Sequence, residues 1–155
     1  LFHETVRLPN GRRTDLDMIE HPGAVLIVPF LDARRIILLR QYRATIKRYL
    51  YELPAGTLNR GEMPLACARR EVVEETGFAA ARFAYLGRIV PVPGYADEKI
   101  FIYKATHLTP AYGAMDDDEI IRTLVVTRLQ VRRLLKSRRL EDAKTIAALA
   151  FCGWL

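Results

Sequence analysis

The alternation of apolar and polar positions predicts that the first half of the chain is rich in β-strands. Residues 2–8 and 13–20 alternate on either side of the turn Pro9-Asn10-Gly11, a pattern typical of a β-hairpin. Two short apolar runs at 25–30 and 35–42 follow and predict a second pair of strands. The second run holds four consecutive aliphatic residues, which favours a strand buried on both faces and therefore central in its sheet.

A further strand is expected at 49–54, and the apolar period then changes from two to that of a helix. Three apolar residues recur at the spacing of one helical face, namely Leu65, Ala68 and Val72. Pro64 suits a first helical turn, where its missing N–H needs no partner, and Gly77 suits a helix end. These positions predict a helix from about Met63-Pro64 to Gly77.

The second half of the chain continues with strands and ends with helices. Strands are expected at 82–92 and 99–106 around a Pro-Gly turn, and a weakly alternating strand is expected at 119–126. Thr127 and Asp142 are suited to cap two final helices, 127–138 and 143–151. In the first of these helices, three leucines are expected to face inward: Leu129, Leu134 and Leu135. The fold class is therefore α/β or α+β, with a mixed sheet and helices packed on it.

Length and composition fit one domain, residues 1–155, with a normal core. Half of the residues are hydrophobic and 27% are charged, as in ordinary globular proteins. The two cysteines, Cys67 and Cys152, match no metal or redox spacing, so we expect buried free thiols in a cytoplasmic protein. No apolar run approaches the ~18 residues that would span a membrane.

The net charge of +6 raises the question of a nucleic-acid partner. However, the basic residues are spread along the chain, and only the segment 136–139 is dense. This segment is typical of the solvated side of a helix, with a general attraction of anionic substrates as the alternative. We therefore do not expect nucleic acid to be the partner.

The helix at 63–77 carries an unusual density of carboxylates. Glu71 and Glu75 lie at i and i+4 on one face, with Glu74 beside them, and like charges at that spacing destabilise a helix. A solvated surface patch is one reading of such residues. A bound divalent cation is the other, because Mg²⁺ prefers carboxylate and carbonyl oxygens and works together with substrate phosphates.

These residues also belong to a longer pattern: glycine, five residues, Glu, seven residues, then Arg-Glu-(aliphatic)-x-Glu-Glu-x-Gly-(apolar). The residues at its fixed positions are Gly56, Glu62, Arg70, Glu71, Val72, Glu74, Glu75, Gly77 and Phe78. This pattern resembles the signature of the Nudix hydrolases, which implies an αβα sandwich fold and metal-dependent hydrolysis of a diphosphate.

The resemblance also implies roles for residues of this segment. Glu71, Glu74 and Glu75 would bind Mg²⁺, or alternatively Mn²⁺, as two or three ions, and the Ala55 carbonyl would complete one site. Arg70 would orient a ligand carboxylate. Glu62 would either bind a more distant metal or cap the loop, whereas Gly56 would serve backbone geometry.

Segments outside the signature resemble the ADP-ribose pyrophosphatase branch of that family. Pro93 lies 16 positions beyond Gly77 and opens the sequence Pro93-Gly94-Tyr95-Ala96-Asp97-Glu98, and Arg43 precedes a Glu52-Leu53-Pro54-Ala55-Gly56 segment. The resemblance implies that Arg43 contacts the substrate phosphates. It also makes Glu52, Pro93 and Glu98 candidates for substrate binding, with a further metal as the alternative for Glu98.

The acidic loop at 116–119 matches the place where relatives carry a general base. Relatives often have Glu at the key position, whereas this chain offers Asp116, Asp118 and Glu119, and a solvated turn is the alternative.

The expected function is hydrolysis of ADP-ribose or a related nucleoside diphosphate sugar. GDP-mannose or UDP-sugar hydrolysis, hydrolysis of nucleic-acid ends or caps, and a non-catalytic nucleotide-sugar sensor are the alternatives. The resemblance further implies a homodimer formed through the N-terminal strands in residues 1–24.

Overall fold

A mixed four-stranded sheet forms the centre of the molecule, and the computed structural model describes residues 1–113 and 120–155. The strand order is β6-β3-β8-β7, with β3 and β8 parallel and the other neighbours antiparallel. The bounds are β3 Ala24–Pro29, β6 Ala55–Thr57, β7 Phe78–Ile89 and β8 Ile100–Pro110. Every residue of β3 is buried, as its uninterrupted apolar run predicts.

A second, antiparallel sheet has the order β5-β4-β9. Its strands are β4 Arg35–Arg43, β5 Arg48–Glu52 and β9 Ile121–Thr127. The expected central position of the 35–42 strand is confirmed, because β4 pairs on both sides. Both strands of the predicted second pair, 25–30 and 35–42, are present, but they belong to different sheets. A single bridge, Phe30–Ile36, joins them, because the aliphatic residues of β4 are used to build the other sheet.

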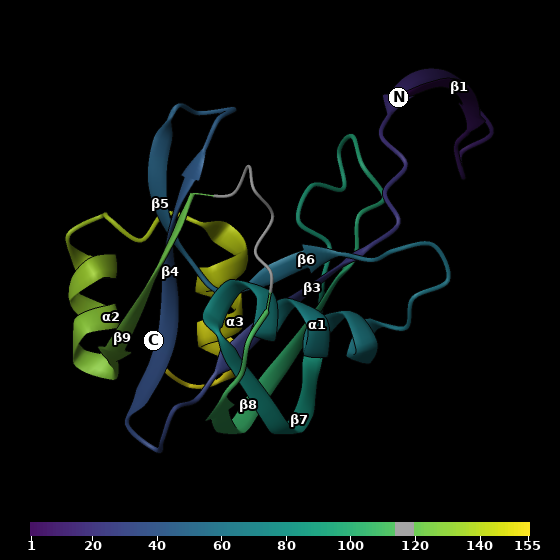
Figure 1. Ribbon diagram of the computed structural model, residues 1–155. Helices are drawn as coiled ribbons and strands as arrows, with labels where there is room; N and C mark the ends of the chain where they lie inside the picture. The colour runs from purple at the N-terminus through teal and green to yellow at the C-terminus, as the bar shows by residue number, and fades with distance from the viewer. Residues whose placement is uncertain (114–119) are drawn as a thin grey trace.

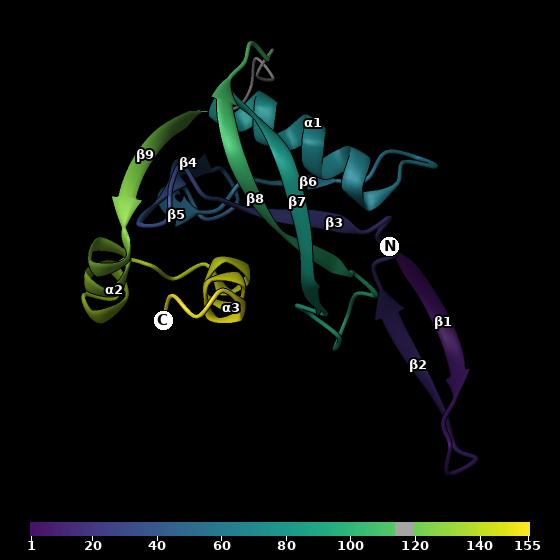
Figure 2. The same ribbon diagram turned by 90° about the horizontal axis from the view of Figure 1, so that it is seen from below.

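Helices cover both faces of the four-stranded sheet, which gives three layers (Figures 1 and 2). Helix α1, Pro64–Thr76, lies on one face, and Val25 and Ile27 point into the apolar cluster beneath it. Helix α3, Ala143–Phe151, lies on the other face, where Leu26 and Val28 enter a larger cluster. Alternate residues of β3 thus serve both cores. The expected αβα sandwich with a mixed sheet is confirmed.

The predicted helix ends are largely those observed. Pro64 opens α1, and Gly77 closes it in the left-handed conformation at φ 71°. Thr127 and Gln130 form a reciprocal capping box at the start of α2, Arg128–Lys136. The inward orientation of Leu129 is wrong: its side chain is 58% exposed, because the buried stripe of α2 runs through Val131 and Leu134. Cys67 is buried, whereas Cys152 is half-buried and directly follows α3.

The predicted N-terminal hairpin is present as β1, Phe2–Arg7, and β2, Arg13–Met18, and it projects away from the sandwich (Figure 2). Its cross-strand register places four apolar residues on one face: Phe2, Val6, Leu16 and Met18. The other face is polar, with His3 bonded to Asp17 and Thr5 to Asp15. The hairpin joins the body through Ile19, whose N–H donates to the Tyr95 carbonyl at 2.8 Å. In the part of the chain that the structure describes, no helix has the length and apolar character needed to cross a membrane.

Candidate active site

Strand β6 and helix α1 approach each other most closely at Gly56. A Cβ atom placed on Gly56 would lie 1.8 Å from Oε1 of Glu71, so the contact requires glycine. The two elements border a polar cavity of about 340 Å³. Its walls are Arg43, Ala55, Gly56, Thr57, Asn59, Arg70, Glu71 and Glu74. Five of the residues predicted to bind metal or substrate, or to shape the loop, thus share one cavity with Arg70.

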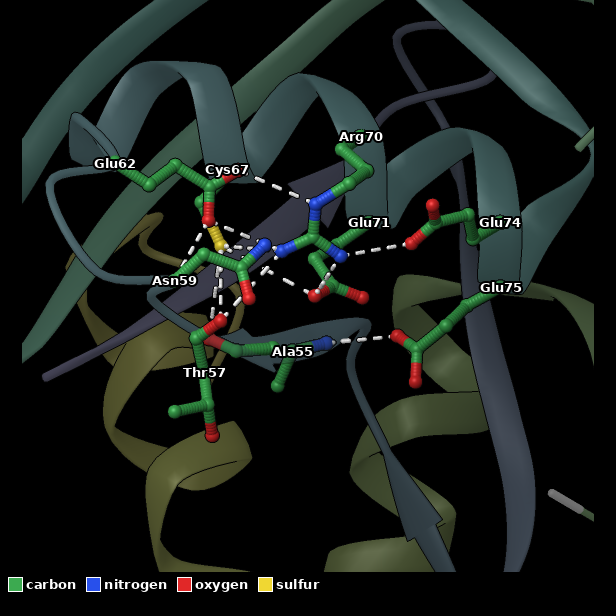
Figure 3. Close-up of polar contacts among 10 residues, drawn as sticks. Ala55, Thr57, Asn59, Glu62, Cys67, Arg70, Glu71, Glu74 and Glu75 are labelled. Atoms are coloured by element: carbon green, nitrogen blue, oxygen red, sulfur yellow. Dashed lines mark hydrogen bonds and ion pairs between the residues drawn. The ribbon is translucent and has the colours of Figure 1, made fainter. Parts of the chain in front are cut away.

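Arg70 lies at the centre of the carboxylates (Figure 3). Its Nη1 donates to Glu71 Oε1 at 2.6 Å and to Glu74 Oε2 at 2.9 Å. Its Nε and Nη2 both reach Glu62 at 3.2 Å. The hydrogen bonds to Glu62, together with the other two carboxylates, raise the pKa of Arg70, and the same contacts hold the pKa of Glu62 below its ordinary value. A guanidinium from the same helix therefore offsets part of the carboxylate repulsion.

Glu62 also closes the loop before the helix. Its Oε2 accepts the backbone N–H of Asn59 at 2.9 Å. This contact matches the loop-capping alternative for Glu62.

Glu75 is directed to the strand rather than to Arg70. Its side chain is 4% exposed, and its Oε2 accepts the backbone N–H of Ala55 at 2.8 Å (Figure 3). This bond fixes the start of β6 against the last turn of α1. Across the described residues, no three His, Cys, Asp or Glu side chains converge as a ready-made metal cluster.

The donors around the cavity nevertheless fit a hard divalent cation. Mg²⁺ is usually held by one or two carboxylates plus substrate phosphates rather than by a complete protein cage. Glu71 and Glu74 supply two carboxylates to the cavity that Ala55 also lines, and Gly56 brings the strand backbone close to Glu71 because it has no side chain.

Arg43 lines the same cavity, and its guanidinium is held by a buried carboxylate. Its Nε and Nη2 donate to the two oxygens of Glu52, each at 2.7 Å, and the Glu52 side chain is fully buried. Lys144 also donates to Glu52, and to Asp142 Oδ1 at 2.8 Å. Burial would raise the pKa of Glu52, but the bonds from Arg43 and Lys144 outweigh it and hold that pKa below its ordinary value. Glu52 is thus placed to orient Arg43.

The remaining predicted site residues are not brought to this cavity by the described part of the chain. Glu98 lies with its Oε1 3.9 Å from His21 Nε2, next to the hairpin attachment, and Pro93 is in the same turn region. Neither lines the Glu71 cavity. Asp116, Asp118 and Glu119 lie outside the described residues.

Two residues of the site were not among the predicted site residues. Lys144 lies 92 positions from Glu52, so only the fold joins them. Asn59 lines the cavity and donates to Glu62 through its backbone, which any residue type could do. The sequence Asp142-Ala143-Lys144-Thr145 at the start of α3 is the feature that could have suggested a role for Lys144.

Comparison with known proteins agrees with this geometry. A family model described as NUDIX domain matches residues 20–149. An ADP-ribose pyrophosphatase of Bacillus subtilis (strain 168) is 35% identical over 153 residues, covering 97% of this chain and 83% of that protein. A methanol dehydrogenase activator of Bacillus methanolicus is 33% identical over 150 residues, covering 96% and 81% respectively.

Comparison with a solved structure also agrees with this fold. The crystal structure of an ADP compounds hydrolase superposes with a TM-score of 0.85 at 27% identity, covering 97% of this chain and 82% of that one. The signature resemblance is thereby confirmed over most of the chain, and the chain belongs to the Nudix family.

Proposed function

We propose that this Nudix protein is a pyrophosphohydrolase that cleaves the diphosphate of ADP-ribose or a related nucleoside diphosphate sugar. The products are a nucleoside monophosphate and a sugar phosphate. The observation that carries the proposal is the convergence of Glu71, Glu74, Gly56 and Arg43 on one polar cavity. The names of the relatives at 35% and 27% identity, both concerned with ADP compounds, support the substrate class.

Nudix hydrolases generally need a divalent cation, and we propose Mg²⁺ or Mn²⁺, as two or three ions, for this chain. When bound, the cation neutralises the diphosphate and makes water a better nucleophile. Glu71, Glu74 and the Ala55 carbonyl would hold it, with Glu75 as a further ligand. A cation held by these carboxylates would compete with Arg70, which donates to both Glu71 and Glu74.

The protein's own groups position the substrate. Arg43, fixed by Glu52, offers its free N–H to a phosphate oxygen and stabilises charge that develops there. A residue of the acidic loop, Asp116, Asp118 or Glu119, would take the proton of the attacking water. Pro93 and Glu98 remain predicted substrate contacts. They lie beside the hairpin attachment, and we propose that a homodimer formed through residues 1–24 completes that side of the site.

A phosphate-release assay coupled to a phosphatase tests the function over ADP-ribose, ADP-glucose, GDP-mannose, UDP-glucose and diadenosine polyphosphates. We expect metal-dependent turnover that is highest with ADP-ribose. The double variant Glu74→Gln/Glu75→Gln should lower kcat about 10²–10⁴-fold, because several kcal/mol of charge stabilisation are lost. Glu141→Gln, on an exposed ion pair with Arg48, is the matched control and should keep full activity. Full turnover in the double variant would contradict the proposal.

A further inference from the structure

Lys144 occupies a position that its charge disfavours. It lies in the first turn of helix α3, two residues after the capping residue Asp142, and the positive end of the helix dipole repels a cation there. Its side chain is only 20% exposed, so burial of the charge adds to the cost. Partners that offset both effects are therefore expected around its ammonium group.

Two carboxylates hold the Lys144 ammonium. Its Nζ donates to Asp142 Oδ1 at 2.8 Å, and Oε2 of Glu52 is its second acceptor. Asp142 belongs to the same helix start, whereas Glu52 lies 92 positions away along the chain at the end of β5. The Glu52 side chain has no exposed surface. Lys144 therefore joins the start of α3 to a fully buried carboxylate.

The same carboxylate holds Arg43 through two bonds. Arg43 Nε donates to Oε1 of Glu52 and Nη2 donates to Oε2, each at 2.7 Å, so Oε2 is shared with Lys144. A two-point contact of this kind fixes the plane of the guanidinium. The Arg43 side chain is 37% exposed and lines the Glu71 cavity. The orientation of the Glu52 carboxylate therefore sets how Arg43 borders that cavity.

Lys144 reaches the cavity through Glu52 rather than directly. The described residues that line the cavity include Arg43 but neither Lys144 nor Glu52. The backbone after Glu52 is fixed separately, because the N–H of Leu53 donates to the buried Thr145 hydroxyl at 2.8 Å. Loss of the Lys144 ammonium would therefore leave the strand in place and loosen the carboxylate, whose Oε2 would keep one cation instead of two.

We propose that Lys144 is a positioning residue of the candidate active site, which fixes the guanidinium of Arg43 toward the substrate diphosphate through the Glu52 carboxylate. The inference deepens the proposed function and rests on it, because it takes Arg43 to bind a phosphate oxygen. A guanidinium stabilises developing charge only where its N–H groups are already aimed at that charge. A small rotation of Arg43 therefore lowers the rate even though its own charge is unchanged.

The NMR signal of the Arg43 Nε–H, recorded on the full chain with EDTA and without substrate, tests the positioning independently of turnover. The signal is assigned by its absence in Arg43→Lys. In Lys144→Met we expect this proton to exchange with water at least about tenfold faster, because a less restrained carboxylate releases it more often. An unchanged exchange rate in Lys144→Met would overturn the proposal.

The matched control is Lys136→Met, which removes the same charge from the exposed last turn of α2. Its Arg43 Nε–H should exchange within about twofold of the wild-type rate, because only the general field of the protein changes. The backbone amide spectrum reports whether each variant is folded. If Lys144→Met does not fold, Lys144→Gln takes its place with the same expected result, since it keeps an N–H donor without the charge.

A double-mutant cycle in kcat/KM for ADP-ribose separates positioning from a general loss of structure. Lys144→Met should lower kcat/KM about tenfold and Arg43→Gln about 100-fold. The variant with both changes should match Arg43→Gln within about twofold, because the guanidinium to be positioned is already gone. Effects that multiply to about 1,000-fold would show a role independent of Arg43 and would also overturn the proposal. A wild type that does not turn over ADP-ribose would contradict the proposed function instead, and the Arg43 Nε–H signal would still decide whether Lys144 positions that guanidinium.

Discussion

At the scale of single residues, we expect that adding one methyl group at Gly56 would disrupt the candidate active site. In Gly56→Ala the new Cβ would overlap the Glu71 side chain, with Oε1, Cδ and Cγ all within 2.4 Å. The side chain can swing away at small cost to the fold, but it then leaves the cavity. We expect kcat to fall at least about 100-fold, with a loss of stability under about 2 kcal/mol.

Gly61→Ala should show the opposite behaviour and is the matched control. Gly61 has φ 78°, so alanine there costs about 1 kcal/mol of stability, yet among the described residues no atom beyond its two chain neighbours lies within 4 Å of the added Cβ. Its activity should remain near that of the wild type. Steady-state kinetics and urea unfolding of both variants measure the two effects separately. Equal activity in Gly56→Ala and Gly61→Ala would show that the position of Glu71 does not matter for turnover.

At the scale of elements, Glu52 joins three parts of the fold. It lies on β5 and binds Arg43 on β4 and Lys144 on α3, while it is fully buried. Glu52→Gln leaves Arg43 without the carboxylate that it binds and Lys144 with Asp142 alone, so the free energy of unfolding should fall by about 2–3 kcal/mol. Glu141→Gln, which breaks the exposed pair with Arg48, should cost about 0.5 kcal/mol or less. Urea unfolding near neutral pH compares the two.

The pH dependence of that difference follows from the depressed pKa of Glu52. A carboxyl whose folded pKa is below its ordinary value of 4.5 stabilises the protein above that value, and the stabilisation is lost as pH falls through the folded pKa. The gap in unfolding free energy between wild type and Glu52→Gln should therefore be constant above about pH 5 and shrink below it. A gap that grew on acidification would mean that the carboxylate is not stabilised in the folded state.

How far the elements could be predicted depends on the range of the interactions that define them. Helix α1 is set by local signals, Pro64 at its start and Gly77 at its end, and its predicted bounds were nearly those observed. The partners of β3 could not be predicted, because its parallel neighbour β8 follows more than 70 residues later. Leu129 was misplaced because a short helix offers several apolar stripes, and only packing on the sheet selects the one through Val131.

The candidate site shows the same division. Gly56, Glu71 and Glu74 of the signature line one cavity, and their proximity is a local effect because β6 and α1 are close in sequence. The expected contact between Arg70 and a candidate ligand carboxylate is present at Glu71, whereas the simultaneous bond to Glu74 depends on the rotamer of Arg70 and could not be predicted from spacing alone. The Lys144–Glu52 contact joins distant segments and required the fold.

At the scale of the whole molecule, the N-terminal hairpin carries four apolar residues on one face, beside Glu4 and Thr14, and the described residues cover this face only in part. Phe2 is 52% and Leu16 38% exposed, and both lie on the face that also carries Val6 and Met18. An isolated two-stranded hairpin is marginal in water, and burial of one face would stabilise it. A second copy of the chain supplies a matching face by two-fold symmetry. We therefore expect a homodimer of twice the 17.7 kDa chain mass.

Substitutions on the two faces of the hairpin test whether the dimer depends on the apolar face or is lost whenever the hairpin strands are altered. Val6→Asp/Leu16→Asp places charges on the apolar face and should give monomers at micromolar concentration by light scattering. His3→Ser/Asp17→Ser removes a 2.8 Å contact from the polar face and should leave the dimer intact. If the partner also completes the substrate site beside Tyr95, the monomeric variant should show a raised KM for ADP-ribose as well. A mass near 17.7 kDa for the unaltered chain would exclude the dimer. Dissociation of both variants would mean that the apolar face is not what holds the copies together.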